Sequence, residues 1–343
     1  MTTRCIAIGA SAGGIEAVKD IISRLPGDFP APVFVVVHIP GSKPSFLPEI
    51  FSKVSLLQAS HPKDGERIKP GHIYVAPPNC HLLIGDNDHI AVKHGPKENR
   101  FRPSIDALFR SAAYIYGQAT IGIVLSGYLD DGTSGLWSIK RLGGIAIVQD
   151  PQQAISYDMP NNALEFIQPD YLIPSYEIGE TLTHLVNESL PETSPAALNK
   201  DLLSHVASEI GIAKGDTAYK EVGEDMTKFG ELTPFSCPEC HGTLQEITEE
   251  TIVRYRCHTG HAYSESALLY GITNNTRDLQ YQVIRSLEEA VMLLDLMGLQ
   301  LQKAGNRERA ALYFAKARKL EKDSKEYYKD VLNHESLSGE NIG

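Results

Sequence analysis

Several features are scarce or missing in the sequence, and each excludes a class of protein. No apolar run approaches the ~20 residues of a membrane-spanning helix, and no export signal precedes the strand-like run Cys5–Ile8. Positive charge is also scarce, since 32 Lys and Arg face 43 Asp and Glu, giving a net charge of −11. That balance argues against nucleic acid or an anionic membrane as the main partner. Five cysteines, an odd number, predict reduced thiols in the cytoplasm.

The first half of the chain alternates strand-like and helix-like patterns, which predicts an α/β fold with a mostly parallel, doubly wound sheet. The predicted strands are short and apolar throughout, as strands buried on both faces should be. They lie at 5–8, 33–37, 73–76, 121–125 and 145–148, and the predicted helices at 14–24, 104–116 and 134–141. Two alternating runs around GDND, within residues 81–94, predict an antiparallel hairpin insertion.

The composition changes after this half, and we expect five segments. The α/β domain covers residues 1–188. A linker with a short helical segment follows at 189–233, because its first part is rich in Pro, Ser and small residues. A small zinc-ribbon-like module is expected at 234–270, then an α-helical hairpin at 275–333 that turns at Gly305-Asn306. A polar tail covers 334–343.

The first strand runs into GASAG, residues 9–13, which fits the pattern G-x-S-x-G. A serine on a sharp strand-to-helix turn exposes its hydroxyl, and the backbone N–H groups from Ala12 onward can stabilise an oxyanion. Two other interpretations stay open. The turn could bind a dinucleotide, although the middle glycine of G-x-G-x-x-G is missing, or Ser11 could cap the helix.

Two further polar residues follow predicted strands that end at the same edge of the sheet. His38 follows the second strand and could act as a general base for Ser11. Asp130 and Asp131 follow the strand near 121–125, and either could orient the imidazole or cap the next helix.

Four spaced motifs together carry a family resemblance: GASAGG, VHIP, RPSIDALF at 102–109, and GYLDDGTSGL at 127–136. The chain resembles the catalytic domain of the chemotaxis protein-glutamate methylesterases, the CheB family. The resemblance implies hydrolysis of γ-glutamyl methyl esters on chemoreceptors with release of methanol, and in some members deamidation of glutamine. It also implies Ser11 as nucleophile, His38 as base, and Asp131, directly before Gly132, as the orienting carboxylate.

The sequence departs from the family pattern at three positions near these motifs. Ala12 replaces a frequent Thr, Val37 a frequent Gln, and Tyr128 a frequent Met. Backbone N–H groups of Ala12 and Tyr128 remain candidate oxyanion donors, while the Tyr128 ring would reshape the pocket. Arg102 is either a pocket residue or a surface and structural one. Regulated family members begin with a receiver domain, and this sequence is expected to be a receiver-less form.

The second half contains CPEC and CHTGH, whose spacing predicts a structural zinc site. The preferred ligands are Cys237, Cys240, Cys257 and His261. His258 or His241 could substitute for His261. A redox pair, or a packed remnant without metal, are the alternatives.

These features predict a cytoplasmic serine esterase of a bacterial chemosensory system, with no catalytic cofactor and no membrane insertion. Its expected partner is the methylated cytoplasmic domain of a chemoreceptor, and other chemosensory proteins are candidate partners of the C-terminal tail. An alternative is a catalytically weak or inactive fold that serves as a docking protein. A nucleotide-binding α/β protein is the third interpretation.

Overall fold

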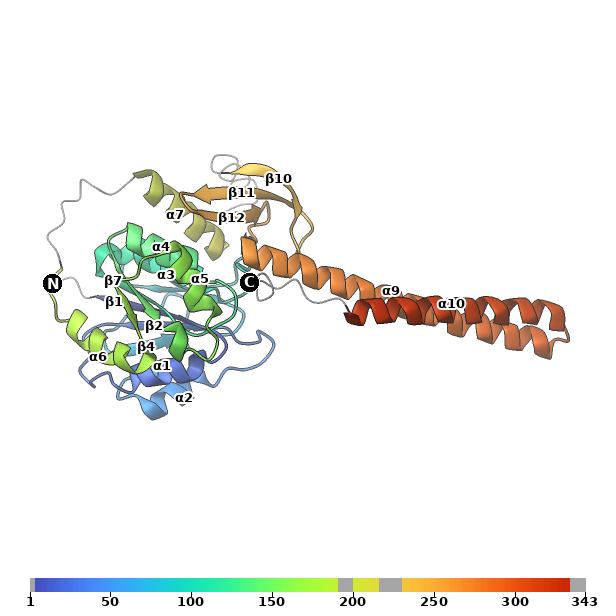
Figure 1. The fold of residues 1–343 in the computed structure, drawn as a ribbon. Helices are drawn as coiled ribbons and strands as arrows, with labels where there is room; N and C mark the ends of the chain where they lie inside the picture. Colours follow the sequence, from blue (N-terminus) through green and yellow to red (C-terminus); the bar gives the residue numbers. More distant parts are fainter. Residues whose placement is uncertain (1–3, 191–199, 216–229, 334–343) are drawn as a thin grey trace. The chain divides into compact units, whose positions relative to one another are not determined.

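A computed structural model describes residues 4–190, 200–215 and 230–333 of the chain (Figure 1). The chain divides into two compact units, Met1–Leu268 and Leu269–Gly343. About half of the expected linker and all of the expected polar tail lie outside the described residues. The boundary expected at residue 188 stays a prediction.

A seven-stranded parallel sheet forms the centre of the first unit (Figure 1). The strands cross it in the order β3 (Gln58–Ser60), β4 (His72–Val75), β2 (Val33–Val37), β1 (Cys5–Ala10), β7 (Thr120–Val124), β8 (Ile145–Gln149) and β9 (Tyr171–Ile173). The chain starts in the middle of the sheet and builds outward on both sides, so the carboxyl ends of β1, β2 and β7 lie together at one edge.

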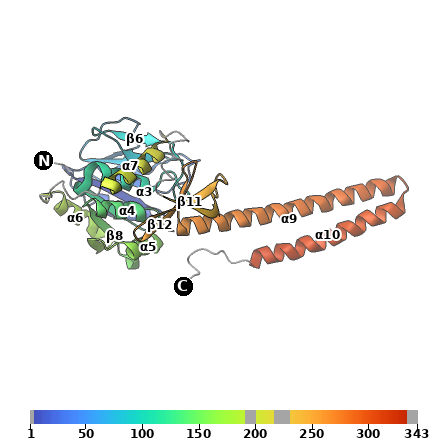
Figure 2. The ribbon, with the colours of Figure 1, turned by 90° about the horizontal axis from the view of Figure 1, so that it is seen from above.

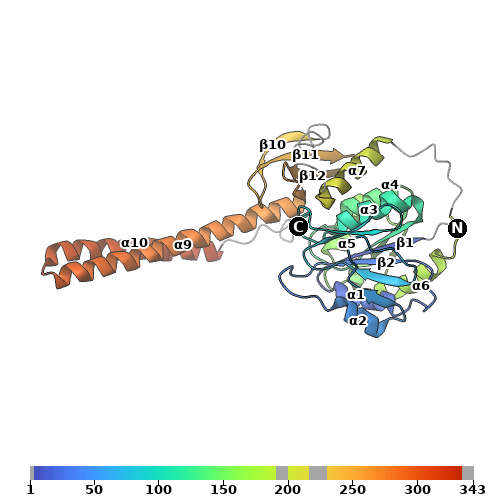
Figure 3. The same ribbon diagram turned by 180° about the vertical axis from the view of Figure 1, so that it is seen from behind.

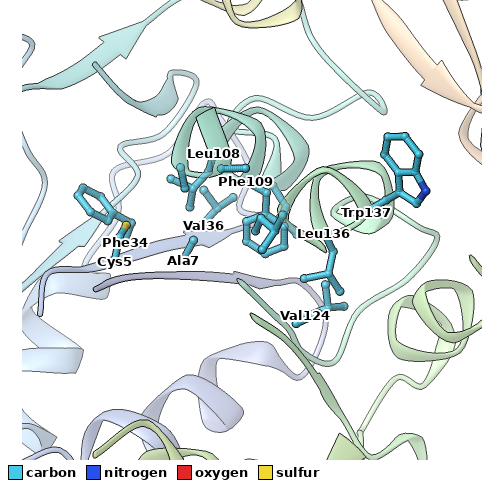
Figure 4. Close-up of a cluster of buried hydrophobic side chains, with 14 of the residues drawn as sticks. Cys5, Ala7, Phe34, Val36, Leu108, Phe109, Val124, Leu136 and Trp137 are labelled. Atoms are coloured by element: carbon cyan, nitrogen blue, oxygen red, sulfur yellow. The ribbon is translucent and has the colours of Figure 1, made fainter. Parts of the chain in front are cut away.

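Helices cover both faces of the sheet because side chains of a buried strand alternate between them. Ile6 and Ile8 pack toward α1 (Gly14–Ile22), α2 (Leu47–Val54) and α6 (Ser175–Leu185). Cys5 and Ala7 pack toward α3 (Ile105–Tyr116), α4 (Thr133–Arg141) and α5 (Asp158–Phe166). Figure 4 shows the second cluster, with Leu108, Phe109 and Leu136 lying over the sheet. The predicted doubly wound fold is therefore confirmed.

The expected hairpin insertion is also present. Strands β5 (His81–Ile84) and β6 (Ile90–Lys93) pair antiparallel in a separate two-stranded sheet. The sequence did not indicate the edge strands β3 and β9, nor α2, α5 and α6. The two strands are short and partly exposed, so they lack the continuous apolar run that marks the central strands. Two 3₁₀ turns, Gly117–Ala119 and Pro151–Gln153, complete the domain.

A four-stranded antiparallel sheet carries the CPEC and CHTGH motifs. It consists of β10 (Glu231–Ser236), β11 (Thr243–Glu249), β12 (Ile252–Cys257) and β13 (Ala262–Ser264). We call residues 230–264 the Cys/His module. Helix α7 (Lys200–Lys214) packs on α3 (Figure 3). Ile252 of the module belongs to the same buried cluster as Leu136 and Trp137. The module therefore contributes one side chain to the core of the α/β domain, while Cys237, Leu244 and Tyr263 belong to a separate buried cluster.

Helices α9 (Glu265–Lys303) and α10 (Arg307–Asn333) form the expected antiparallel hairpin (Figure 2). Gly305 adopts φ 80° between them, as a helix stop requires. Gly298 allows close approach, because a Cβ there would meet the Phe314 ring at 2.6 Å. Helix α9 begins at Glu265 rather than near residue 275, since strand β13 leads directly into it. Within the described residues, no helix combines the length and apolar character that a membrane crossing requires.

Candidate active site

Ser11 lies on the tight turn between β1 and α1. Its N–H donates to the carbonyl of Ser126 at 2.9 Å, and its own carbonyl accepts from Gly14 N at 2.9 Å. Gly13 adopts φ 74° at the start of α1, a left-handed conformation that favours glycine. The Ser126 hydroxyl donates to the Ala12 carbonyl at 2.7 Å. The backbone around Ser11 is thus fixed from β1, α1 and the end of β7.

Gly127 provides the space that the Ser11 side chain occupies. A Cβ at this position would lie 2.7 Å from the Ser11 Cβ and 2.0 Å from the Met159 sulfur. The backbone leading into Tyr128 therefore runs directly beside Ser11. The Tyr128 side chain itself is exposed, at 54% of its surface, and is not among the residues that line the cleft beside His38.

His38 directly follows β2 and lies beside the Ser11 turn. Its N–H donates to the carbonyl of Ala10 at 3.1 Å, because Ala10 and Val37 are paired in the parallel register of β1 and β2. The imidazole stacks on the Phe101 ring, with 3.7 Å between centroids and 6° between planes. Only 3% of the side chain is exposed. Its Nε2 lies 2.8 Å from Asp131 Oδ2.

The carboxylate of Asp131 is buried and surrounded by donors. Besides His38, it accepts from Asn99 Nδ2 at 2.9 Å and from the Ser104 hydroxyl at 3.0 Å. The first N–H groups of α3 also donate to it, from Ile105 at 2.7 Å. Burial by itself would raise the pKa of Asp131, but the hydrogen bonds and charge of His38 and these N–H donors lower it to about 2. The carboxylate is therefore ionised at neutral pH and stabilised by the helix N-terminus.

An ionised carboxylate can only accept hydrogen bonds, so Nε2 of His38 carries a proton, and in the neutral form of the ring Nδ1 is the acceptor. Nδ1 is buried, and among the described residues it has no hydrogen-bond partner. In the same part of the chain, no hydrogen bond joins Ser11 Oγ to the ring. The structure thus holds a buried imidazole, oriented by Asp131, next to the serine turn.

Ser104 occupies the N-cap position of α3 without a side-chain capping hydrogen bond. It precedes α3, but its hydroxyl makes no capping bond to that helix and donates to Asp131 instead. Asp131, from a loop 26 residues away in the chain, accepts from the first N–H of α3 in its place. Ile105, Leu108 and Phe109 are fully buried and belong to the core of the domain.

Asn99 and Phe101 contact the site and were not predicted from the sequence. They lie just before RPSIDALF, in the stretch ENRF, where neither shows a periodic or motif signal of its own. Their contacts to Asp131 and His38 depend on the packing of the loop before α3. Their position directly before the motif RPSIDALF was the sequence signal that could have indicated them.

Arg102 borders a cleft of about 390 Å³ next to His38. Its Nε and Nη2 donate to the Asn79 side chain at 3.1 and 2.8 Å, and Nη1 donates to the carbonyl of Gly95 at 2.6 Å. A guanidinium has five N–H donors, so two remain for a ligand. Arg102 therefore braces the wall of this cleft and lines it together with His38.

Asp130 lies next to Asp131 in the chain but does not contact His38. Its carboxylate accepts from the Ser264 hydroxyl at 2.6 Å. Burial is the main cause that raises the pKa of Asp130 to about 6, and the charge of Asp131 adds to it. The two neighbouring carboxylates therefore have opposite pKa shifts, which makes their effects on stability separable.

We expect Asp130→Asn to increase the free energy of unfolding at pH 7.5 by about 2–3 kcal/mol. The pKa of Asp130 is about 6 in the folded protein and lower in the unfolded chain, so ionisation of this carboxyl destabilises the fold as the pH rises from about 4 through 6. Asparagine at this position does not ionise and avoids this loss. The gain should therefore vanish near pH 4. Denaturant unfolding followed by the fluorescence of Trp137, the single tryptophan, measures it. Asp131→Asn is the matched control and should instead lose stability at pH 7.5, because its pKa is lowered. Equal effects of both variants would contradict the prediction.

The four cysteine and histidine side chains expected to bind zinc lie together in the Cys/His module. The ligand atoms of Cys237, Cys240, Cys257 and His261 all lie within 4.8 Å of one another. The Cys240 and Cys257 sulfurs are 3.6 Å apart, and His261 Nδ1 lies 3.6 Å from Cys257 Sγ. Three sulfurs and one imidazole at these spacings suit a tetrahedral metal. His241 and His258, the alternatives from the sequence, are outside this group.

Neighbouring side chains prepare this group for a cation. Hydrogen bonds, above all with Cys237, lower the pKa of Cys257 to about 7 despite its burial. The Tyr263 hydroxyl lies 3.1 Å from Cys237 Sγ, where it can donate to a thiolate. The donor set and its surroundings therefore fit a metal such as zinc.

Taken together, the sheet, the serine turn and the buried His–Asp pair at the strand ends define an α/β protein with a hydrolase-like site. Residues 6–182 match the family described as CheB methylesterase, and the chain belongs to this family.

Its relatives agree with this assignment. A protein of Leptospira interrogans is 38% identical over 192 residues, which cover 56% of this chain and all of that relative. A protein of Thermotoga maritima named protein-glutamate methylesterase/protein-glutamine glutaminase is 36% identical over 53% of this chain and 54% of its own length. The crystal structure of the Thermotoga maritima CheB methylesterase catalytic domain superposes with a TM-score of 0.52 at 34% identity. The superposed region comprises 54% of this chain and all of that domain.

Proposed function

We propose that this protein is a serine esterase that hydrolyses γ-glutamyl methyl esters on the cytoplasmic domain of a chemoreceptor in a bacterial chemosensory system. The observation that carries the proposal is the buried His38–Asp131 pair at 2.8 Å, held beside the Ser11 turn. A buried ionised carboxylate that fixes the imidazole tautomer is the arrangement a general base for serine requires. The family and its named relatives favour this substrate class.

The first step is attack by Ser11 on the ester carbonyl. His38 Nδ1, the ring nitrogen left free to accept, takes the Ser11 proton. Asp131 stabilises the imidazolium that forms. The carbonyl oxygen becomes negative and accepts from the backbone N–H groups of Ala12 and Tyr128, which flank Ser11. Each well-aimed donor of this kind contributes about 3–4 kcal/mol.

The second step releases the product. The imidazolium returns its proton to the methoxide, which leaves as methanol, and a water molecule then cleaves the acyl-enzyme with His38 as base. A glutamine side chain offers the same carbonyl with ammonia as leaving group, so the site also suits deamidation. The new carboxylate on the product faces a protein of net charge −11, which favours release.

The Cys/His module is proposed to hold a structural zinc through Cys237, Cys240, Cys257 and His261. Bound zinc would supply folding free energy to a small sheet with few apolar residues. No step of ester hydrolysis needs it.

The proposed function is tested with the full chain and methyl-esterified chemoreceptor fragments. We expect release of methanol in proportion to enzyme, and covalent labelling of Ser11 by a fluorophosphonate probe, which requires an activated hydroxyl. Labelling of Ser11 without methanol release would mean that the protein is a serine hydrolase with another class of substrate. Neither labelling nor methanol release would overturn the esterase and favour the docking protein.

Arg102→Lys is expected to raise the KM for the receptor ester by about tenfold and to change kcat much less. Lysine keeps the positive charge but cannot donate simultaneously to Asn79 and Gly95 and into the cleft as the planar guanidinium does. Steady-state methanol release measures both constants. Arg24→Lys, on an exposed arginine outside the cleft, is the control. An unchanged KM in Arg102→Lys would mean that Arg102 only braces the wall.

A further inference from the structure

The loop before α3 connects the Cys/His module to the proposed active site. Strand β13 of the module lies against residues 97–99, where Asn99 N donates to the Ala262 carbonyl at 2.8 Å and Ala262 N to the Lys97 carbonyl at 3.2 Å. The same loop continues to Phe101, which stacks on His38. Residues 97–101 therefore contact the module at one end and the His38 imidazole at the other.

The Asn99 side chain spans the remaining distance. Its Oδ1 accepts from the backbone N–H of Ser264, the last residue of β13, at 2.9 Å. Its Nδ2 donates to Asp131 Oδ1 at 2.9 Å and to Asp106 Oδ2 at 2.8 Å. An amide has one oxygen acceptor and two N–H donors, so the Ser264 N–H determines which end of the amide faces the carboxylates. Asn99 is 95% buried, since only 5% of its surface is exposed.

The backbone at Asn99 suits this role. Its φ is 48°, in the left-handed region that asparagine tolerates better than most residues. Glycine adopts the same conformation without a side chain, so the amide can be removed without straining the loop.

A buried ionic cluster fixes the module in this position. Arg254 and Arg256 of β12 reach Glu209 of α7, Arg256 also lies 3.6 Å from Glu98, and Arg110 of α3 pairs with Glu98. Each of these side chains is at most 5% exposed. The loop residue Glu98, next to Asn99, is thus held by charges from both the α/β domain and the module. Any separation would leave buried charges unpaired, which is strongly unfavourable.

We propose that Asn99 is a positioning residue for the Asp131–His38 pair, held by strand β13, so that the Cys/His module is a working part of the esterase site. This inference rests on the proposed function for its catalytic consequence. The family match ends at residue 182, before the module begins, so the contact from Ser264 is additional to the family domain. Asn99 fixes Asp131 Oδ1 and thereby aims Oδ2 at His38 Nε2.

The test is Asn99→Gly in the full chain. We expect kcat for methanol release to fall by about tenfold or more, with KM within about twofold, because substrate binding does not involve Asn99. The second readout is ¹⁵N NMR of the histidine ring nitrogens. The wild type should show His38 protonated at Nε2 alone, and the variant a mixture of tautomers. His38→Gln identifies the His38 signals.

Two further variants keep the test decisive. Asn99→Asp retains an acceptor for the Ser264 N–H but offers no donor to Asp131. In this variant, as in Asn99→Gly, the His38 ring should become a mixture of tautomers. Asn99→Asp replaces Asn99→Gly in the test if the glycine variant does not fold. Arg141→Ala removes an exposed ion pair between α4 and Glu250 of the module, so it should keep both the wild-type kcat and the wild-type tautomer.

Wild-type kcat and an unchanged His38 tautomer in a folded Asn99→Gly protein would overturn the inference. If the wild-type chain releases no methanol and Ser11 is not labelled, the proposed function fails. In that case the NMR comparison still decides whether Asn99 positions the pair.

Discussion

Ser11→Ala is expected to lower kcat for methanol release by about a millionfold, the loss typical when the nucleophile of an acyl-transfer triad is removed. Water would have to attack the ester directly, because His38 and the N–H donors remain but no acyl-enzyme can form. The fold should be unaffected, since the structural contacts of Ser11 are made by its backbone. Methanol release under single-turnover conditions, with fluorophosphonate labelling, measures the loss.

Ser23→Ala is the matched control for this experiment. Its hydroxyl donates to the Asp20 carbonyl at the exposed end of α1, so both turnover and labelling should stay at the wild-type level. Trp137 fluorescence should show the same unfolding curve for both variants and the wild type. Labelling of Ser11→Ala at any other serine, with unchanged turnover, would remove the assignment of Ser11.

Removal of the zinc proposed for the Cys/His module should produce the second large effect, on stability. In isolated zinc-finger peptides, a structural zinc contributes an apparent binding free energy of about 10–16 kcal/mol. Loss of even a third of this would lower the Tm of the first unit by about 10 °C or more. We expect this shift both on treatment with a strong chelator and in Cys257→Ser. The Cys257 sulfur lies at the centre of the group, 3.6 Å from both Cys240 Sγ and His261 Nδ1.

Metal content and calorimetry together test this prediction. The wild type should hold one metal ion per chain and Cys257→Ser none. Cys80→Ser, which changes a cysteine outside the four-residue group, should keep both the metal and the Tm. A chelated protein with an unchanged Tm would show that the module folds without metal, and would favour the packed remnant over the zinc site.

Local sequence patterns were sufficient to predict the central strands of the sheet. Strands β1, β2 and β7 are buried over their whole length, and the apolar runs that this burial requires made them visible in the sequence. The polar residues beyond their carboxyl ends, Ser11, His38 and Asp131, were placed at one sheet edge by the same reasoning. Edge strands β3 and β9 were not predicted, because a partly exposed strand of three residues has no distinctive sequence pattern.

The sequence by itself determined the parallel sheet, the turn that carries Ser11, the polar residues that follow neighbouring strands, and the spacing of the Cys and His residues in the module. These features follow from short-range periodicity and from the constraint that parallel strands end at one edge. Only the tertiary structure decided that Asp131 accepts from the start of α3, that Phe101 stacks on His38, and that Ser264 reaches Asp131 through Asn99. These contacts join residues far apart in the chain, and their geometry depends on how whole elements pack, which no local pattern encodes.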